Sequence, residues 1–269
     1  MTTPTTWHVP PPPPPRRLLH VEMVMGTAFI FDVRMDHAEQ RRAAEAAVAE
    51  ANTWLHWVDA TFTTYDNASF VMRLRRDEIS LEQCPHEVAE VVAACHEWRE
   101  RTDGWFDAWA GPDGFDPSGY VKGWAAQRAS DLLRAHGFDR HCVNGGGDVV
   151  AAGTPGDVAT WRVGVVDPFD RQRVRCALRV TDAAVATSGI GERGLHVWRR
   201  DGSPAQTLAS VTLIAGDLIQ ADVLATAALA MGELAQAWLA GLGVDALLID
   251  TSGAETLTGG VAALLQRLP

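Results

Sequence analysis

The chain has 269 residues, of which 47% are hydrophobic and 21% charged, so it can bury a sizeable core as one large domain or two small ones. Its formal net charge of −11 at pH 7 argues against a general nucleic-acid-binding surface, which requires a basic field. An anionic ligand would therefore have to be met by local donors.

The N-terminal segment, residues 1–17, is predicted to be a disordered, proline-rich tail, since six consecutive prolines begin at Pro10. A ligand for a proline-binding module is the alternative interpretation. The segment lacks the apolar core of a signal peptide, and no stretch of the chain reaches membrane-spanning length. The four cysteines form no CxxC motif, and we interpret them as packing residues rather than metal ligands or nucleophiles. We therefore expect a cytoplasmic protein that does not span a membrane.

Residues 18–269 show neither an internal repeat nor a linker, and strand-like and helix-like patterns follow one another. Apolar alternation predicts a strand over residues 28–33, and Asp36 is a good N-cap for an amphipathic helix over residues 37–59. The other expected helices cover residues 85–102, 120–136, 220–231, 235–241 and 260–267. The other expected strands cover residues 141–150, which three glycines interrupt, and residues 161–167, 174–180, 183–187, 208–215 and 246–249. This mixture predicts a single α+β domain.

A candidate phosphate site runs from Asp116 to Gly123. Lys122 falls in the expected first turn of a helix, where free N–H groups and the positive end of the helix dipole favour phosphate. Gly119 and Gly123 remove side chains where a ligand would come close. The alternative is that Asp116 and Ser118 only cap the helix, and that Lys122 is a solvated surface charge.

A candidate metal site lies at Asp222 and Thr226. These residues are four apart in a helix-forming run, so both oxygens fall on one helical face. Magnesium prefers carboxylate and hydroxyl oxygens and usually shares them with substrate phosphates. The pattern therefore indicates a phosphorylated ligand bound through a metal. Alternatively, Asp222 is a helix N-cap and the Thr226 hydroxyl bonds to the carbonyl four residues earlier.

Two glycine-containing segments and one histidine are weaker candidates. The glycines at residues 145–147 match neither GxGxxG nor the P-loop spacing, and Asn144 and Asp148 beside them fit a simple tight turn. The segment Thr187-Ser188-Gly189 fits either a substrate-facing loop or a common turn. His196 could be a general base near neutral pH, although a lone histidine at a strand start is more often structural.

The order and spacing of these motifs resemble the ApbE family of FAD:protein FMN transferases. The resemblance covers nearly the whole chain, from about residue 21 to residue 250. Its motifs are Met25-Gly26-Thr27, Thr63-Thr64-Tyr65, Gly104-Trp105-Phe106-Asp107, Asp116-Pro117-Ser118-Gly119 with Lys122-Gly123, Asn144-Gly145-Gly146-Gly147-Asp148, Ala186-Thr187-Ser188-Gly189, His196-Val197, Gly202 with Pro204, and Ala221-Asp222-Val223-Leu224-Ala225-Thr226. One such motif could be coincidental, whereas the ordered series is specific.

The resemblance implies one T-fold-like flavin transferase domain over residues 18–269, with mixed or antiparallel sheets flanked by helices. It implies that the substrate FAD contacts Met25, Tyr65, Trp105, Phe106, Asp107, Asp116 and Lys122. It also implies a Mg²⁺ site at Asp222 and Thr226, completed by backbone oxygens of Gly119 and Ala225, and a catalytic base at His196. Members of this family move FMN from FAD to a threonine hydroxyl of an acceptor protein and release AMP.

The chain departs from the family pattern beside the implied base. Arg199-Arg200 stand where the family usually has an Asp-Pro pair, and Ile190-Gly191 replace a tyrosine that often follows the Ser-Gly pair. Flavin binding is therefore better supported than transfer. The alternatives are an FAD pyrophosphatase, which would yield FMN and AMP, and a non-catalytic FAD-binding protein.

Overall fold

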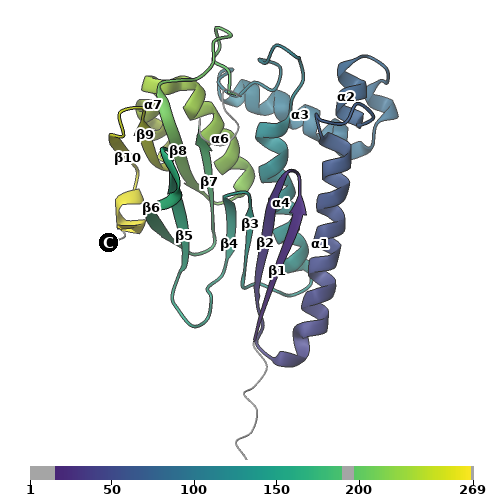
Figure 1. Ribbon diagram of the computed structural model, residues 1–269, viewed down its shortest axis with the longest axis vertical. Helices are drawn as coiled ribbons and strands as arrows, with labels where there is room; N and C mark the ends of the chain where they lie inside the picture. Colours follow the sequence, from purple (N-terminus) through teal and green to yellow (C-terminus); the bar gives the residue numbers. More distant parts are fainter. Residues whose placement is uncertain (1–15, 190–196, 268–269) are drawn as a thin grey trace, which may run out of the picture.

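Two antiparallel sheets and a layer of helices form the fold in the computed structural model, which describes residues 16–189 and 197–267 (Figure 1). The larger sheet has eight strands, which are, in spatial order, β1 (Arg17–Val24), β2 (Thr27–Arg34), β3 (His141–Gly145), β4 (Asp148–Ala152), β7 (Ala183–Gly189), β8 (Leu208–Ala215), β9 (Asp245–Asp250) and β10 (Glu255–Thr258). The smaller sheet has three, which are β11 (Leu265–Arg267), β6 (Asp170–Val180) and β5 (Trp161–Asp167). All neighbouring strands in both sheets run antiparallel. The predicted α+β class with antiparallel sheets is confirmed.

Except for α2, the helices follow the predicted order. They are α1 (Arg41–Phe62), α2 (Phe70–Arg75), α3 (His86–Arg101), α4 (Ser118–Ala135), α6 (Leu218–Met231), α7 (Ala235–Leu242) and α8 (Val261–Leu264). Helix α4 packs between α1 and α6, and these three helices cover one face of the larger sheet (Figure 1).

A hydrophobic core lies on each face of the larger sheet. The helices close one core, and the smaller sheet closes the other above β4, β7, β8 and β9. Strand β9 contributes to both, because Ala246 and Leu248 face the helices whereas Leu247 and Ile249 face the smaller sheet. Side chains alternate along a strand, so a strand that is buried on both sides must be apolar throughout.

Helix α6 is buried around most of its circumference, which explains its almost continuously apolar sequence. The expectation that no stretch reaches membrane-spanning length is wrong by length and composition alone, since within the described residues one helical stretch, Leu218–Leu242, is long and apolar enough to cross a membrane. However, 72% of its most apolar window is buried inside the fold, as is expected of a core helix.

Two predicted elements are wrong in detail. Residues 141–150 are not one interrupted strand but the hairpin of β3 and β4, because Gly146 and Gly147 take positive φ angles of 65° and 105° and reverse the chain. The expected helix at residues 260–267 ends after one turn, and its last residues pair with β6 as β11.

Some elements were not predicted from the sequence. The alternating pattern before residue 35 holds two strands, β1 and β2, and helix α2 and strand β10 are too short to leave a clear pattern. Strand β1 begins at Arg17, and residues 1–15 lie outside the described part of the chain, so the proline-rich tail stays a prediction.

Candidate active site

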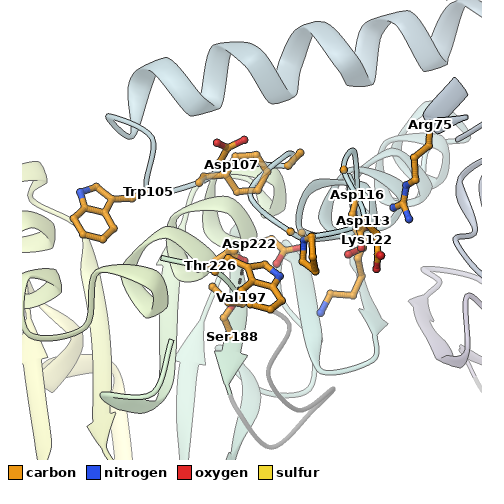
Figure 2. Close-up of a pocket in the computed structure, with 18 of the residues that line it drawn as sticks. Arg75, Trp105, Asp107, Asp113, Asp116, Lys122, Ser188, Val197, Asp222 and Thr226 are labelled. Carbon is orange, nitrogen blue, oxygen red and sulfur yellow. Dashed lines mark hydrogen bonds between the residues drawn. The ribbon is translucent and has the colours of Figure 1, made fainter. Parts of the chain in front are cut away.

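A cavity of about 280 Å³ opens beside the N-terminus of α4, the middle of α6 and the end of β7. Figure 2 shows Trp105 on one side of this cavity, Lys122 on the other, and Asp222 and Thr226 between them. The residues that line it are Arg75, Trp105, Phe106, Asp107, Ala108, Gly111, Pro112, Asp113, Gly114, Asp116, Ser118, Gly119, Lys122, Thr187, Ser188, Val197, Trp198, Asp222 and Thr226.

The N-terminus of α4 forms one wall. The carboxylate of Asp116 accepts a hydrogen bond from the Ser118 amide at 3.0 Å, which orders the entry into the helix. The guanidinium of Arg75 donates two hydrogen bonds to the Phe115 carbonyl, at 3.0 and 2.7 Å, and holds the preceding loop. The amides of Tyr120 and Val121 in this turn donate to the Pro117 carbonyl, at 2.9 Å each, so the helix offers an anion in the cavity the positive end of its dipole rather than a row of free amides.

Helix α6 presents Asp222 and Thr226 to the same cavity. Asp222 is only 3% exposed, and its Oδ2 accepts a hydrogen bond from the Gly123 amide at 3.0 Å. The Thr226 hydroxyl lies 3.1 Å from the Ser188 hydroxyl on β7. The N-cap of α6 is Asp217, whose carboxylate accepts from the Gln220 amide at 2.8 Å, so Asp222 does not cap the helix.

Gly123 serves the packing of the two helices, which corrects the expectation that it leaves room for a ligand. A Cβ built at Gly123 would lie 2.9 Å from the Cβ of Asp222 and 2.9 Å from the Leu218 carbonyl oxygen. Gly119, in contrast, does line the cavity, and a Cβ there would lie 3.4 Å from the Phe106 ring and 3.6 Å from Thr226. Of Gly119 and Gly123, therefore, Gly119 is the one that leaves space on the ligand side.

Lys122 is held by a buried carboxylate. Its Nζ lies 2.7 Å from Oδ2 of Asp148, which is 1% exposed, and Oδ1 of Asp148 accepts from the Thr187 amide at 2.9 Å. The Thr187 hydroxyl in turn lies 2.9 Å from that of Thr212 on β8. Asp148 thereby connects α4, β4 and β7, and it fixes the ammonium group at the cavity wall.

The opposite wall is aromatic. Phe106 is buried, and the guanidinium of Arg200 lies 5.3 Å from the centroid of the Trp105 ring while it pairs with Asp103 at 3.1 Å. Arg200 thus packs against one side of the indole. Asp107 is fixed by Arg99 at 3.0 Å and by the Trp109 amide at 2.8 Å.

Eight of the twelve site residues that we expected line this cavity, namely Trp105, Phe106, Asp107, Asp116, Gly119, Lys122, Asp222 and Thr226. Met25 lies at the turn between β1 and β2 with a φ of 56°, and Tyr65, after α1, is 93% exposed. Ala225 is fully buried in α6, and none of these three lines the cavity. His196 lies outside the described residues, although Val197, the next residue, lines the cavity. The roles of these four residues stay predictions.

The contact between Lys122 and Asp148 was not predicted from the sequence, although one signal was present. Lys122 is the only lysine in the chain, beside 22 arginines. Lysine is a compact point charge, whereas arginine is a wide planar fork. A chain that otherwise uses arginine throughout indicates, at its single lysine, a position that requires the smaller group.

The carboxylate and hydroxyl oxygens of the cavity fit a magnesium ion that the protein shares with a bound ligand. They do not fit a metal that the protein holds alone. Among the described residues, no group of three or more His, Cys, Asp or Glu side chains could hold an ion. Of the four carboxylates that line the cavity, Asp222 is the one on α6 with Thr226, whose hydroxyl contacts that of Ser188. Magnesium typically takes one or two carboxylates and completes its shell with water and phosphate oxygens.

The buried cysteine near this site is not a nucleophile. Burial raises the pKa of the Cys95 thiol to about 12, so the thiol stays protonated at neutral pH. The interpretation of Cys95 as a packing residue is therefore supported.

Known proteins resemble this chain in sequence and in fold. The model of the ApbE family matches residues 25–113 and 114–248. Two curated proteins named FAD:protein FMN transferase are similar over part of the chain. The Klebsiella pneumoniae (strain 342) protein is 34% identical over 116 residues, which are 39% of this chain and 33% of that protein. The Treponema pallidum (strain Nichols) protein is 35% identical over 96 residues, which are 32% of this chain and 26% of that protein. The match thus spans a third or less of these relatives.

Solved structures share the fold along nearly the whole chain. The flavin transferase ApbE from Vibrio cholerae has a TM-score of 0.78 at 19% identity, and the alignment covers 92% of this chain and 99% of that one. The ApbE protein from Thermotoga maritima has a TM-score of 0.79 at 22% identity, with 94% and 100% covered. The apo flavinyl transferase ApbE from Pseudomonas stutzeri has a TM-score of 0.76 at 22% identity, with 92% and 97% covered.

Proposed function

The chain belongs to the ApbE family, and from this membership we propose that it is a magnesium-dependent FAD:protein FMN transferase. FAD would be the substrate, a threonine hydroxyl of another protein the acceptor, and AMP the second product. The observation that carries the proposal is a single cavity lined by Lys122, Asp222, Thr226 and Trp105.

The two walls of the cavity suit the two chemical parts of FAD. The pyrophosphate is anionic, and the positive end of the α4 dipole and the Lys122 ammonium would meet its charge. The isoalloxazine ring is flat and largely apolar, and Trp105 and Phe106 would contact its face. This assignment explains why an acidic chain keeps its one lysine at this wall.

Asp222 and Thr226, with the Gly119 backbone, would hold Mg²⁺ against the pyrophosphate. Bound there, the ion would neutralise charge that develops on the phosphate oxygens during transfer. The protein part of the site is already ordered, because Asp222 is fixed by the Gly123 amide and Thr226 by Ser188. Little reorganisation would accompany binding.

In the transfer, the threonine oxygen would form a bond to the phosphorus of the FMN half of FAD. The bond from this phosphorus to the bridging oxygen would break, and the electron pair would leave with AMP. The hydroxyl proton must go to a base, since a neutral hydroxyl is a weak nucleophile. We assign this role to His196, which directly precedes the cavity residue Val197.

Incubation with FAD, Mg²⁺ and a threonine-bearing acceptor protein tests the proposal, with in-gel flavin fluorescence and intact mass as readouts. A covalent FMN adduct on the acceptor supports it. Free FMN and AMP without an adduct would instead indicate a pyrophosphatase, and unchanged FAD a binding protein. Omission of Mg²⁺, and an acceptor with threonine replaced by valine, are the controls. The cytoplasmic location of such an acceptor is part of the proposal, and cell fractionation tests it.

The base is tested with His196→Ala. Proton abstraction typically contributes about 10²–10⁴-fold to a rate, while FAD binding requires none. The variant should therefore keep its FAD affinity within a few-fold and lose transfer by at least about 100-fold. Unimpaired transfer would place the base elsewhere.

A further inference from the structure

The edge strand β1 is long and regular, and α1 packs against one of its faces. It forms one edge of the larger sheet and pairs with β2 through all eight of its residues, without a register shift. Strand β1 contains no proline, and its two charged residues are Arg17 at its first position and Glu22, whose carboxylate contacts Asn52 and His56 of α1. Its exposed hydrophobic side chains are Leu19, Val21 and Met23, which are 56%, 53% and 67% exposed. Edge strands are usually protected by short length, charge, proline or a bulge.

The other described sheet edges have such protection. Strands β10 and β11 have four and three residues, and β5 carries register shifts between Val165 and Asp167. Only β1 is a long and regular edge within the described residues (Figure 1).

The turn after β1 determines which backbone groups are free. Met25 and Gly26 form a two-residue loop with φ angles of 56° and 69°, as in the hairpin turns that match strand twist. In such a hairpin the flanking pair, Val24 and Thr27, is hydrogen-bonded, and bonded pairs alternate along the strands. The even-numbered residues of β1 therefore bond to β2, whereas Leu19, Val21 and Met23 direct their N–H and C=O groups outward.

We propose that β1 is a self-association surface, on which β1 of a second copy pairs antiparallel about a two-fold axis at Val21. Leu19 of one copy then lies opposite Met23 of the other, and Val21 lies opposite its own equivalent. These are the residues with outward backbone groups, so the pairing forms a continuous ladder across the two chains.

The side chains on both faces of β1 fit this register. On one face the pairs are apolar, Leu19 with Met23 and Val21 with Val21. On the other face His20 lies opposite Glu22 of the second copy, which is a pair of complementary groups. Within one chain Glu22 already contacts His20 at 3.3 Å and His56 at 3.0 Å, so its carboxylate is held at this edge. A shift of the register by two residues would instead place Glu22 opposite Glu22 of the second copy, or His20 opposite His20. Either shift loses the His20–Glu22 pair.

Sedimentation equilibrium of the full chain, from about 1 to 100 μM, tests the association. We expect a concentration-dependent dimer of 29.1 kDa chains. Val21→Lys places two like charges opposite each other and should weaken the dimer at least about 10-fold. Leu257→Lys, at the β10 edge of the same sheet, is the matched control and should leave the dimer unchanged. A wild-type chain that is monomeric throughout would overturn the proposal, as would a dimer that Val21→Lys does not weaken.

Cysteine cross-linking tests the register without weakening the edge. In the proposed dimer the two Cα atoms at position 21 are about 5.5 Å apart, within the range for a disulfide, so Val21→Cys should cross-link on oxidation. Leu19→Cys is the control, because its two copies lie about 13 Å apart along the strands and cannot be bridged. The parent chain reports any background from its own four cysteines. Cross-linking at position 19 but not at position 21 would refute this pairing.

Discussion

The Gly123 amide donates to the buried Asp222 carboxylate at 3.0 Å, although the two residues are 99 positions apart in the chain. The contact joins the start of α4, which fits an anion, to the α6 carboxylate, which fits a metal. The contact can be this short because residue 123 is a glycine. The nearest atoms of α6 leave no space for a Cβ at this position.

Gly123→Ala should therefore force the two helices apart. Overpacking of this kind typically costs about 1–3 kcal/mol, and the displacement of Asp222 should also weaken Mg²⁺-dependent FAD binding. Urea unfolding and calorimetric titration with FAD and Mg²⁺ measure the two effects. Gly241→Ala in α7 is the matched control, because a Cβ there meets nothing within 4 Å, and it should stabilise the chain by about 0.5–1 kcal/mol. Equal behaviour of the two variants would contradict the packing argument.

Asp222→Asn tests the metal role separately from packing. The amide keeps an oxygen for the Gly123 contact, so the thermal midpoint should change little, whereas the charge that attracts Mg²⁺ is lost. Transfer should fall by at least about 100-fold, since metal-based charge stabilisation is worth several kcal/mol. The control is Asp217→Asn, because asparagine caps a helix about as well as aspartate and Asp217 does not line the cavity. Full Mg²⁺-dependent activity of Asp222→Asn would show that the metal assignment is wrong.

Because Lys122 is the only lysine in the chain, chemical labelling can measure whether a ligand covers it. An amine-specific reagent can modify only Lys122 and the N-terminal amine, and we expect FAD to protect Lys122. Peptide mass spectrometry separates the two sites, and Lys122→Arg removes one of them. This variant should lose about 10- to 100-fold in transfer, the equivalent of one charge-assisted hydrogen bond, because the guanidinium does not fit in place of Nζ beside Asp148. Labelling that FAD leaves unchanged would remove Lys122 from the ligand site.

Features that depend on residues close together in the sequence could be predicted, whereas features that depend on the packing of distant segments could not. The Asp222–Thr226 pair and the α4 start could be predicted because their spacing is local and helical periodicity fixes their geometry. The role of Gly123 and the link from Lys122 to Asp148 could not, since both depend on how distant elements pack. Short elements such as β11 failed for a related reason, because a partner strand rather than their own pattern determines their structure.

The contact between His141 and the Ser130 hydroxyl resembles a catalytic pair but is structural. His141 on β3 is fully buried, its Nε2 lies 2.7 Å from the Ser130 hydroxyl on α4, and its Nδ1 lies 2.7 Å from the Phe138 carbonyl. Because the carbonyl can only accept, Nδ1 carries the proton and Nε2 accepts from Ser130. No substrate can reach this pair, and it connects the helix layer to the sheet.

The burial of His141 predicts how stability depends on pH. Desolvation lowers the pKa of His141 from 6.5 to about 4 in the folded chain, so below pH 6.5 the unfolded chain binds a proton that the folded chain excludes. This contribution to stability is fully present above pH 6.5 and is lost as the pH falls toward 4, for a total of roughly 3 kcal/mol. Urea unfolding at several pH values, compared between the wild type and His141→Asn, isolates the effect, because titration of the carboxylates is common to both chains. The difference between the two free energies of unfolding should shrink as the pH falls from 7.5 to 4.5. Ser130→Ala, which keeps the histidine, should retain most of this pH dependence, and parallel curves for wild type and His141→Asn would show that the imidazole is not excluded from protonation.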